Sequence, residues 1–206
     1  MKKIYSILQL TALFLGAAVP TYGNAGWTNK EKPKVVKLVP PALDQKVILE
    51  KIGCARPFRE GMFDITAKTI KTASGRKKVV VSCCGHGGVG WTTLKGSVDE
   101  AVSLLEKKKI SKKTAIRIIG AGCMGLCAAL ELTDRGYYVV GITAMELYDI
   151  PSWKAAGYFA TIHLNTSHSE QKRLNRINSD TLKYYQRIAR GEHPYITKDT
   201  VRMMPV

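Results

Sequence analysis

The stretch of sequence that decides the fold is Ala115-Ile116-Arg117-Ile118-Ile119-Gly120-Ala121-Gly122-Cys123-Met124-Gly125. Its β-branched first half predicts a strand over residues 115–119, and the glycine turn that follows opens a helix over residues 126–135. Gly136 ends that helix, and the apolar residues 138–143 predict another strand. A strand–turn–helix–strand order of this kind predicts two parallel strands joined by a right-handed crossover.

The three glycines of this turn have the spacing of a dinucleotide-binding fingerprint. Gly120 permits the tight turn, Gly122 lets a pyrophosphate approach the backbone, and Gly125 lets the helix pack closely on the strand. The helix N-terminus then offers free N–H groups to the phosphates. The residues expected to contact the diphosphate are Gly120, Ala121, Gly122, Met124 and Gly125. The alternative is a turn that is rich in glycine for packing alone.

The acidic residue that usually follows the second strand and binds the adenosine ribose is displaced in this chain. Thr143 and Ala144 stand at the expected place, and the first carboxylate is Glu146. Glu146 is therefore a candidate ribose ligand, with a solvated side chain as the alternative. No arginine lies beside it, so a 2′-phosphate is not favoured.

A second glycine-rich segment, Gly85–Gly90, follows a β-branched run at residues 78–83 that predicts a buried strand. Consecutive glycines let a flat ring or an anion lie against backbone N–H groups, and Thr92 can add a hydroxyl. His86 lies between the glycines and is expected to have a structural role. A mobile turn is the alternative. The capping box at residues 97–100 predicts that the next helix begins there.

The remaining segments give a leader, an arm and a C-terminal helix. Residues 1–25 combine two lysines, an apolar run and small residues, which predicts a signal peptide of an exported bacterial protein, periplasmic or secreted. An uncleaved anchor is the alternative. Residues 26–50 are rich in lysine and proline and predict an extended basic arm, and residues 51–68 are expected to be irregular. A helix is expected over residues 178–190.

The charge balance is the unusual feature of the composition. There are 32 lysines and arginines against 16 acidic residues, a net charge of +16. Nucleic acid, an anionic membrane surface and small anionic ligands would all fit this charge. The basic residues are spread along the chain without a nucleic-acid-binding motif, so we expect mainly a solvated surface and no nucleic-acid partner. After the leader, no apolar stretch is long enough to span a membrane.

The five cysteines predict neither a metal site nor a closed set of disulfides. They are Cys54, Cys83, Cys84, Cys123 and Cys127. An odd number cannot pair completely within one chain, and neither a Cys-x-x-Cys pair nor suitably spaced histidines are present. We expect them to be small buried residues and expect no metal.

Four segments together resemble the D-amino-acid oxidase family. Residues 84–92 are similar to the glycine loop that holds the flavin end of FAD in that family, and residues 118–125 resemble its FAD fingerprint. The element Arg56-Pro57-Phe58-Arg59 matches the family's Arg-Pro-x-Arg element, and residues 152–157 resemble the segment that follows the fingerprint. The order of the segments is permuted, and the family's antiparallel substrate domain has no counterpart.

The resemblance implies a Rossmann-like FAD-binding α/β fold over residues 51–206, with a parallel sheet and the substrate domain largely missing. It implies that Arg56 binds the carboxylate of an amino-acid substrate, which a guanidinium suits. Besides the fingerprint, the FAD-binding residues that it implies are Gly87, Gly88, Val89, Gly90, Trp91, Thr92, Ser152, Ala156 and Gly157.

The expected reaction is FAD-dependent oxidative deamination of an amino acid, with oxygen as the acceptor. No catalytic base is required, because the flavin accepts a hydride while the protein orients the substrate. Two alternatives stay open. One is a non-catalytic or split FAD-binding module, which a second chain would complete. The other is a basic exported protein that binds nucleic acid or membrane.

Overall fold

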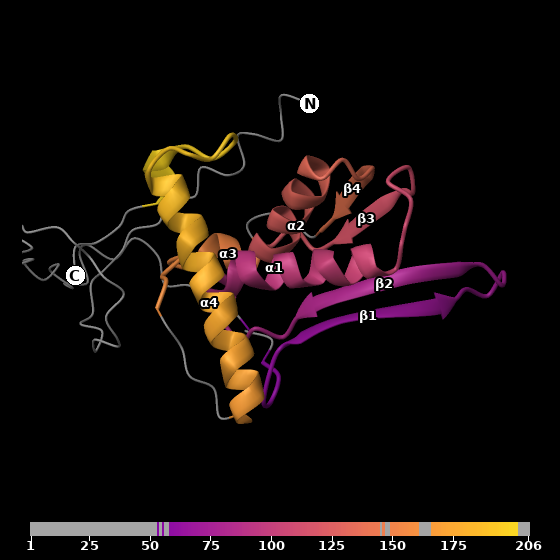
Figure 1. Ribbon diagram of the computed structural model, residues 1–206, viewed down its shortest axis with the longest axis horizontal. Coiled ribbons are helices and arrows are strands. Elements are labelled where there is room, and N and C mark those ends of the chain that lie inside the picture. The colour runs from indigo at the N-terminus through magenta and orange to yellow at the C-terminus, as the bar shows by residue number, and fades with distance from the viewer. Residues whose placement is uncertain are drawn as a thin grey trace, which may run out of the picture.

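The computed structural model describes Gly53, Ala55 and residues 58–144, 146, 149–160 and 166–201. The leader and the basic arm predicted over residues 1–50 lie outside these residues. The elements are β1 (Asp64–Lys71), β2 (Lys77–Cys84), α1 (Gly90–Lys107), β3 (Ile116–Ile119), α2 (Cys123–Asp134), β4 (Val139–Thr143), α3 (Pro151–Lys154), α4 (His168–Ala189) and the 3-10 helix η4 (Lys198–Thr200). The chain is therefore of mixed α and β structure (Figure 1).

Strands β3 and β4 pair in parallel, as the sequence predicts. Ile116 lies opposite Val139 and Ile119 opposite Thr143, and α2 provides the connection between the strands. The described part of the chain thus contains a parallel sheet of two strands.

Strands β1 and β2 form a separate antiparallel hairpin, with register from Asp64 opposite Cys84 to Lys71 opposite Lys77. Two expectations are therefore wrong. Residues 64–68 are not irregular, because they gain backbone partners from β2 across a short turn. The strand over residues 78–83 is not buried on both faces, because α1 covers only one face of the hairpin. Figure 1 shows this hairpin extending beside α1.

The helices are longer than the sequence predicts. Helix α1 begins at Gly90 rather than at the expected capping box, and Ser97 is a fully buried residue in its middle. Helix α2 begins at Cys123, three residues early, and α4 begins at His168. Ser167 caps α4, because its hydroxyl accepts the Glu170 N–H at 3.3 Å.

Helix α1 is the centre of the packing. Val98, Val102 and Leu105 join residues of α2, β2 and β3 in one cluster, whereas Ala101 faces β1 and α4 in a second. Helix α4 crosses α1 at Gly96, where an added Cβ would lie 2.5 Å from the carbonyl oxygen of Ile177. Glycine is therefore what allows the two helices to approach so closely.

None of the described helices is both long enough and apolar enough to cross a membrane.

Candidate functional site

The first glycine turn, between β3 and α2, has the geometry that a dinucleotide fingerprint needs. Gly120 has a φ of +101°, a conformation that side-chain-bearing residues rarely adopt. A Cβ on Gly125 would lie 1.9 Å from the carbonyl oxygen of Gly120, so only glycine fits where α2 leaves β3. The turn therefore holds the N-terminus of α2 close to the end of the strand.

Ser152 caps that N-terminus from another element. Gly122 is the N-cap of α2 and has no side chain to offer, and the hydroxyl of Ser152 on α3 accepts the Cys123 N–H at 3.0 Å. A Cβ on Gly122 would lie 3.1 Å from the Ser152 oxygen. Ser152, placed in the site by the resemblance, thus lies against the fingerprint turn.

The second glycine loop leads directly into α1. A turn closes with the Val89 N–H donating to the His86 carbonyl at 3.0 Å, and Gly90 is the first helical residue. Trp91 and Thr92 therefore belong to the first turn of a helix and not to a loop, which corrects the expected element boundary. Phe58 lies against this loop, since a Cβ on Gly87 would meet its ring at 2.7 Å.

The N-termini of α1 and α2 lie side by side. A Cβ on Gly90 would lie 3.5 Å from the sulfur of Cys123 and 3.8 Å from the terminal carbon of Met124. Further along, Lys95 of α1 pairs with Glu131 of α2 at 3.1 Å. The two helices therefore run in the same direction, and their positive dipole ends meet at one place.

The segment after α3 returns to this place. The backbone N–H of Ala160 donates to the hydroxyl of Thr92 at 3.4 Å, and Thr92 is buried. Ala156 and Gly157 lie between this contact and Ser152 in the chain; Ala156 is exposed and Gly157 has a φ of +67°. The structure thus brings residues 85–92, residues 120–125 and the stretch from Ser152 to Ala160 together.

Trp91 has one satisfied and one unsatisfied polar group. Its carbonyl accepts the hydroxyl hydrogen of Tyr185 at 2.6 Å, whereas its indole N–H is buried and has no hydrogen-bond partner among the described residues. Tyr185 comes from α4, 94 residues away, and was not among the expected site residues. The sequence places Tyr185 on an apolar helix face, but nothing in it indicates which carbonyl the hydroxyl would reach.

His86 fixes the second glycine loop to the body of the protein. Its ring stacks on Phe63 with centroids 4.3 Å apart, and Nε2 lies 3.3 Å from the hydroxyl of Ser97. The side chain is 8% exposed, and this burial lowers the histidine pKa to about 4. The imidazole is therefore neutral at pH 7 and has structural contacts on two sides.

One expected site residue, the candidate ribose ligand, forms no hydrogen bond or ion pair with these segments in the part of the chain that the structure describes. Glu146 is exposed beyond the end of β4, and its backbone carbonyl accepts the Asp149 N–H at 3.0 Å. Arg56 lies outside the described residues, so its expected role stays a prediction.

The cysteines differ from the expectation in their exposure. Cys84 is exposed, Cys83 and Cys123 are partly exposed, and only Cys127 of the four described is buried. Burial raises the pKa of Cys83 to about 12 and also raises those of Cys123 and Cys127. These three thiols therefore stay protonated at neutral pH. Within the described ranges, no histidine, cysteine and carboxylate cluster could hold a metal.

Comparisons of the chain with models of protein families, with curated proteins and with solved structures gave no match.

Proposed function

We propose that this chain binds FAD at the paired N-termini of α1 and α2 and acts as an FAD-dependent oxidoreductase similar to D-amino-acid oxidase. One observation carries the proposal. Residues 85–92, residues 120–125 and the stretch from Ser152 to Ala160 are far apart in the sequence, yet they meet at these two helix ends. These segments overlap residues 84–92, 118–125 and 152–157, which resemble FAD-binding elements of that family.

The residues present fit a dinucleotide. Two helix N-termini provide backbone N–H groups and positive dipole ends for a diphosphate. Gly120 and Gly125 give the close strand–helix approach that a dinucleotide fingerprint needs. The buried indole N–H of Trp91 has no acceptor in the part of the chain that the structure describes, and a bound ligand could supply one. Ser152 already accepts the first N–H of α2, so the N–H groups that follow it in the first turn are the ones that a diphosphate would use.

The catalytic part of the proposal rests on the resemblance alone. A bound FAD would accept two electrons from an amino acid, which is thereby oxidised to an imino acid. It would then pass these electrons to oxygen, which is reduced to peroxide. Arg56 would hold the substrate carboxylate, and Glu146 the adenosine ribose.

The test is FAD binding by the purified chain and by two glycine variants. Gly120 and Gly75 both have positive φ values, +101° and +76°, and no described neighbour lies within 4 Å of an added Cβ at either position. Gly120→Ala and Gly75→Ala should therefore both cost about 1 kcal/mol of stability through backbone strain. Gly75 lies in the hairpin turn, far from the proposed site along the chain. We expect only Gly120→Ala to weaken FAD binding, by about tenfold or more for a loss of 1.4 kcal/mol.

Binding is measured from the flavin absorbance and from quenching of flavin fluorescence. A purified chain without flavin bands that also fails to bind added FAD would contradict the cofactor proposal. Peroxide release with D-alanine or glycine then separates an oxidase from a non-catalytic FAD-binding module. If the chain binds FAD but releases peroxide with none of the amino acids tested, the oxidase is rejected and the non-catalytic FAD-binding module is supported.

A further inference from the structure

One end of the molecule is strongly basic. Residues 65–80 contain five lysines and arginines, residues 107–117 contain six, and neither stretch contains an acidic or aromatic residue. All eleven basic residues are exposed. The first stretch forms most of the β1–β2 hairpin, and the second runs from the end of α1 into β3. We call these two stretches the basic end.

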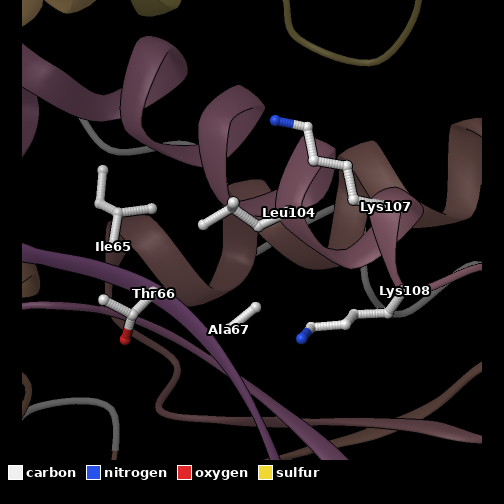
Figure 2. A pocket seen from close by; sticks show the side chains of 6 residues that line it. All are labelled: Ile65, Thr66, Ala67, Leu104, Lys107 and Lys108. Atoms are coloured by element: carbon white, nitrogen blue, oxygen red, sulfur yellow. The ribbon is translucent and has the colours of Figure 1, made fainter.

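The two stretches meet along a groove between β1 and the end of α1. Its volume is about 440 Å³, and its lining consists of Ile65, Thr66, Ala67, Leu104, Lys107 and Lys108. Figure 2 shows the two lysine side chains extending on opposite sides of Leu104, with Ile65 and Ala67 facing that leucine from β1. The groove thus has apolar walls with ammonium groups beside them.

The described carboxylates do not neutralise the charge of the basic end. None of its eleven basic side chains forms an ion pair with a described carboxylate. The nearest acidic neighbours along the chain have other partners: Asp64 pairs with Arg59 at 3.8 Å, and Glu106 with Arg135 at 3.2 Å. A concentrated positive field therefore faces the solvent.

The outer face of the hairpin adds exposed apolar side chains to this charge. Ile70 and Val80 are 45% and 43% exposed. Strand alternation places them on the same face as Lys68 and Lys78, because Lys68 pairs with Val80 and Ile70 with Lys78. Apolar and cationic side chains therefore alternate across one exposed surface.

We propose that the basic end binds the surface of an anionic phospholipid bilayer, without spanning it. Lysine ammonium groups are attracted to the phosphates, while Ile70 and Val80 enter the boundary with the acyl chains. Single-stranded nucleic acid fits less well, because the hairpin face that carries Ile70 and Val80 has no aromatic side chain for base stacking. A phosphate backbone also gives the two apolar side chains nothing to pack against.

The test compares two variants of the full chain that lose the same amount of charge. The basic-end variant combines Lys68→Gln, Lys71→Gln, Lys77→Gln and Lys78→Gln, all on the hairpin that carries Ile70 and Val80. The control combines Lys172→Gln, Lys183→Gln, Arg187→Gln and Lys198→Gln, which are exposed positions on α4 and η4. Both retain residues 1–50, so any binding by those residues contributes equally. Thermal melts establish that each variant is folded.

Binding is measured by co-sedimentation with phosphatidylcholine vesicles, with and without phosphatidylglycerol. The chain should bind the anionic vesicles. The basic-end variant should partition about a thousandfold more weakly, and the control should lose several-fold at most. The double variant Ile70→Ser, Val80→Ser should also bind the vesicles more weakly, yet bind an oligonucleotide unchanged. Equal losses in both charge variants would overturn the proposal. Unchanged vesicle binding by the double variant would also overturn it. That result would indicate that charge alone drives binding, as expected for a polyanion such as nucleic acid.

Discussion

His86 illustrates how single residues fix the site. It is neutral, it stacks on Phe63 and it lies next to the Ser97 hydroxyl, so that the glycine loop is joined to α1. Charging this ring by acid would place an unpaired cation in an apolar environment.

We expect His86 to make the stability of the protein depend on pH. Burial lowers its pKa from 6.5 to about 4, so below pH 6.5 the unfolded chain binds more protons than the folded one. The stabilisation is complete above pH 6.5 and is lost as the pH falls towards 4. Lowering the pH from 6.5 to about 5 should remove about 1 to 2 kcal/mol of unfolding free energy. Urea denaturation over this range measures the loss, and His86→Gln should reduce its slope.

The control is His193→Gln. Burial also lowers the pKa of His193, but its side chain is less buried, so its removal should change the slope less. An unchanged pH dependence in His86→Gln would show that His86 is not the group responsible.

At this scale, the sequence predicts the residues whose role depends on local spacing. The positions of Gly120 and Gly125 follow from a strand, a turn and a helix that are continuous in the chain. The hydrogen bond to the Trp91 carbonyl does not follow from local spacing, because Tyr185 belongs to a helix that is distant in the sequence. The burial of Ser97 was also unpredictable, since it depends on His86 and α4.

At the level of elements, the sequence predicts the order of β3, α2 and β4 but not where the helices begin. Helix α1 starts within Gly90-Trp91-Thr92-Thr93, residues of low helix propensity. Packing against α2 and α4 outweighs that preference. The sequence also could not predict that β2 pairs with β1 instead of β3, because alternative partners of a short strand have similar local patterns.

The crossing of α1 and α4 gives a prediction for Gly96. Alanine has the higher helix propensity and alone would stabilise α1 by about 1 kcal/mol. Because its Cβ would lie 2.5 Å from the Ile177 carbonyl oxygen, the helices must separate. We expect Gly96→Ala to lower the unfolding free energy by about 2 kcal/mol, measured by urea denaturation.

Ser103→Ala is the matched control on the same helix. Ser103 is exposed and bonds only the Asp99 carbonyl within its own helix, so the change should be within about 0.5 kcal/mol. Stabilisation by Gly96→Ala would contradict the close crossing.

At the level of the whole molecule, the described chain is two small sheets held together by helices. An isolated pair of strands is only marginally stable, so each sheet depends on the helices packed against it. Helix α1 contacts both the hairpin and α2 and therefore connects the two parts. A ligand bound at the start of α1 would therefore stabilise the entire fold.

We expect FAD to raise the melting temperature of the protein. At a concentration of about 100 times its dissociation constant, a ligand adds about 2.7 kcal/mol of stability. Riboflavin has the same ring without phosphates and should shift the melting temperature much less, with FMN in between. Thermal melts followed by circular dichroism provide the measurement, and an equal shift with riboflavin and FAD would argue against a diphosphate site at the helix ends.

The parallel course of α1 and α2 has a consequence for the unliganded protein. The positive N-terminal ends of α1 and α2 lie next to each other and repel each other. A bound anion would reduce this repulsion. The folded state is therefore sensitive to its solvent ions. The folded protein should be more stable in phosphate or sulfate than in chloride at equal ionic strength. The buffer salt chosen for purification and storage would therefore affect its stability.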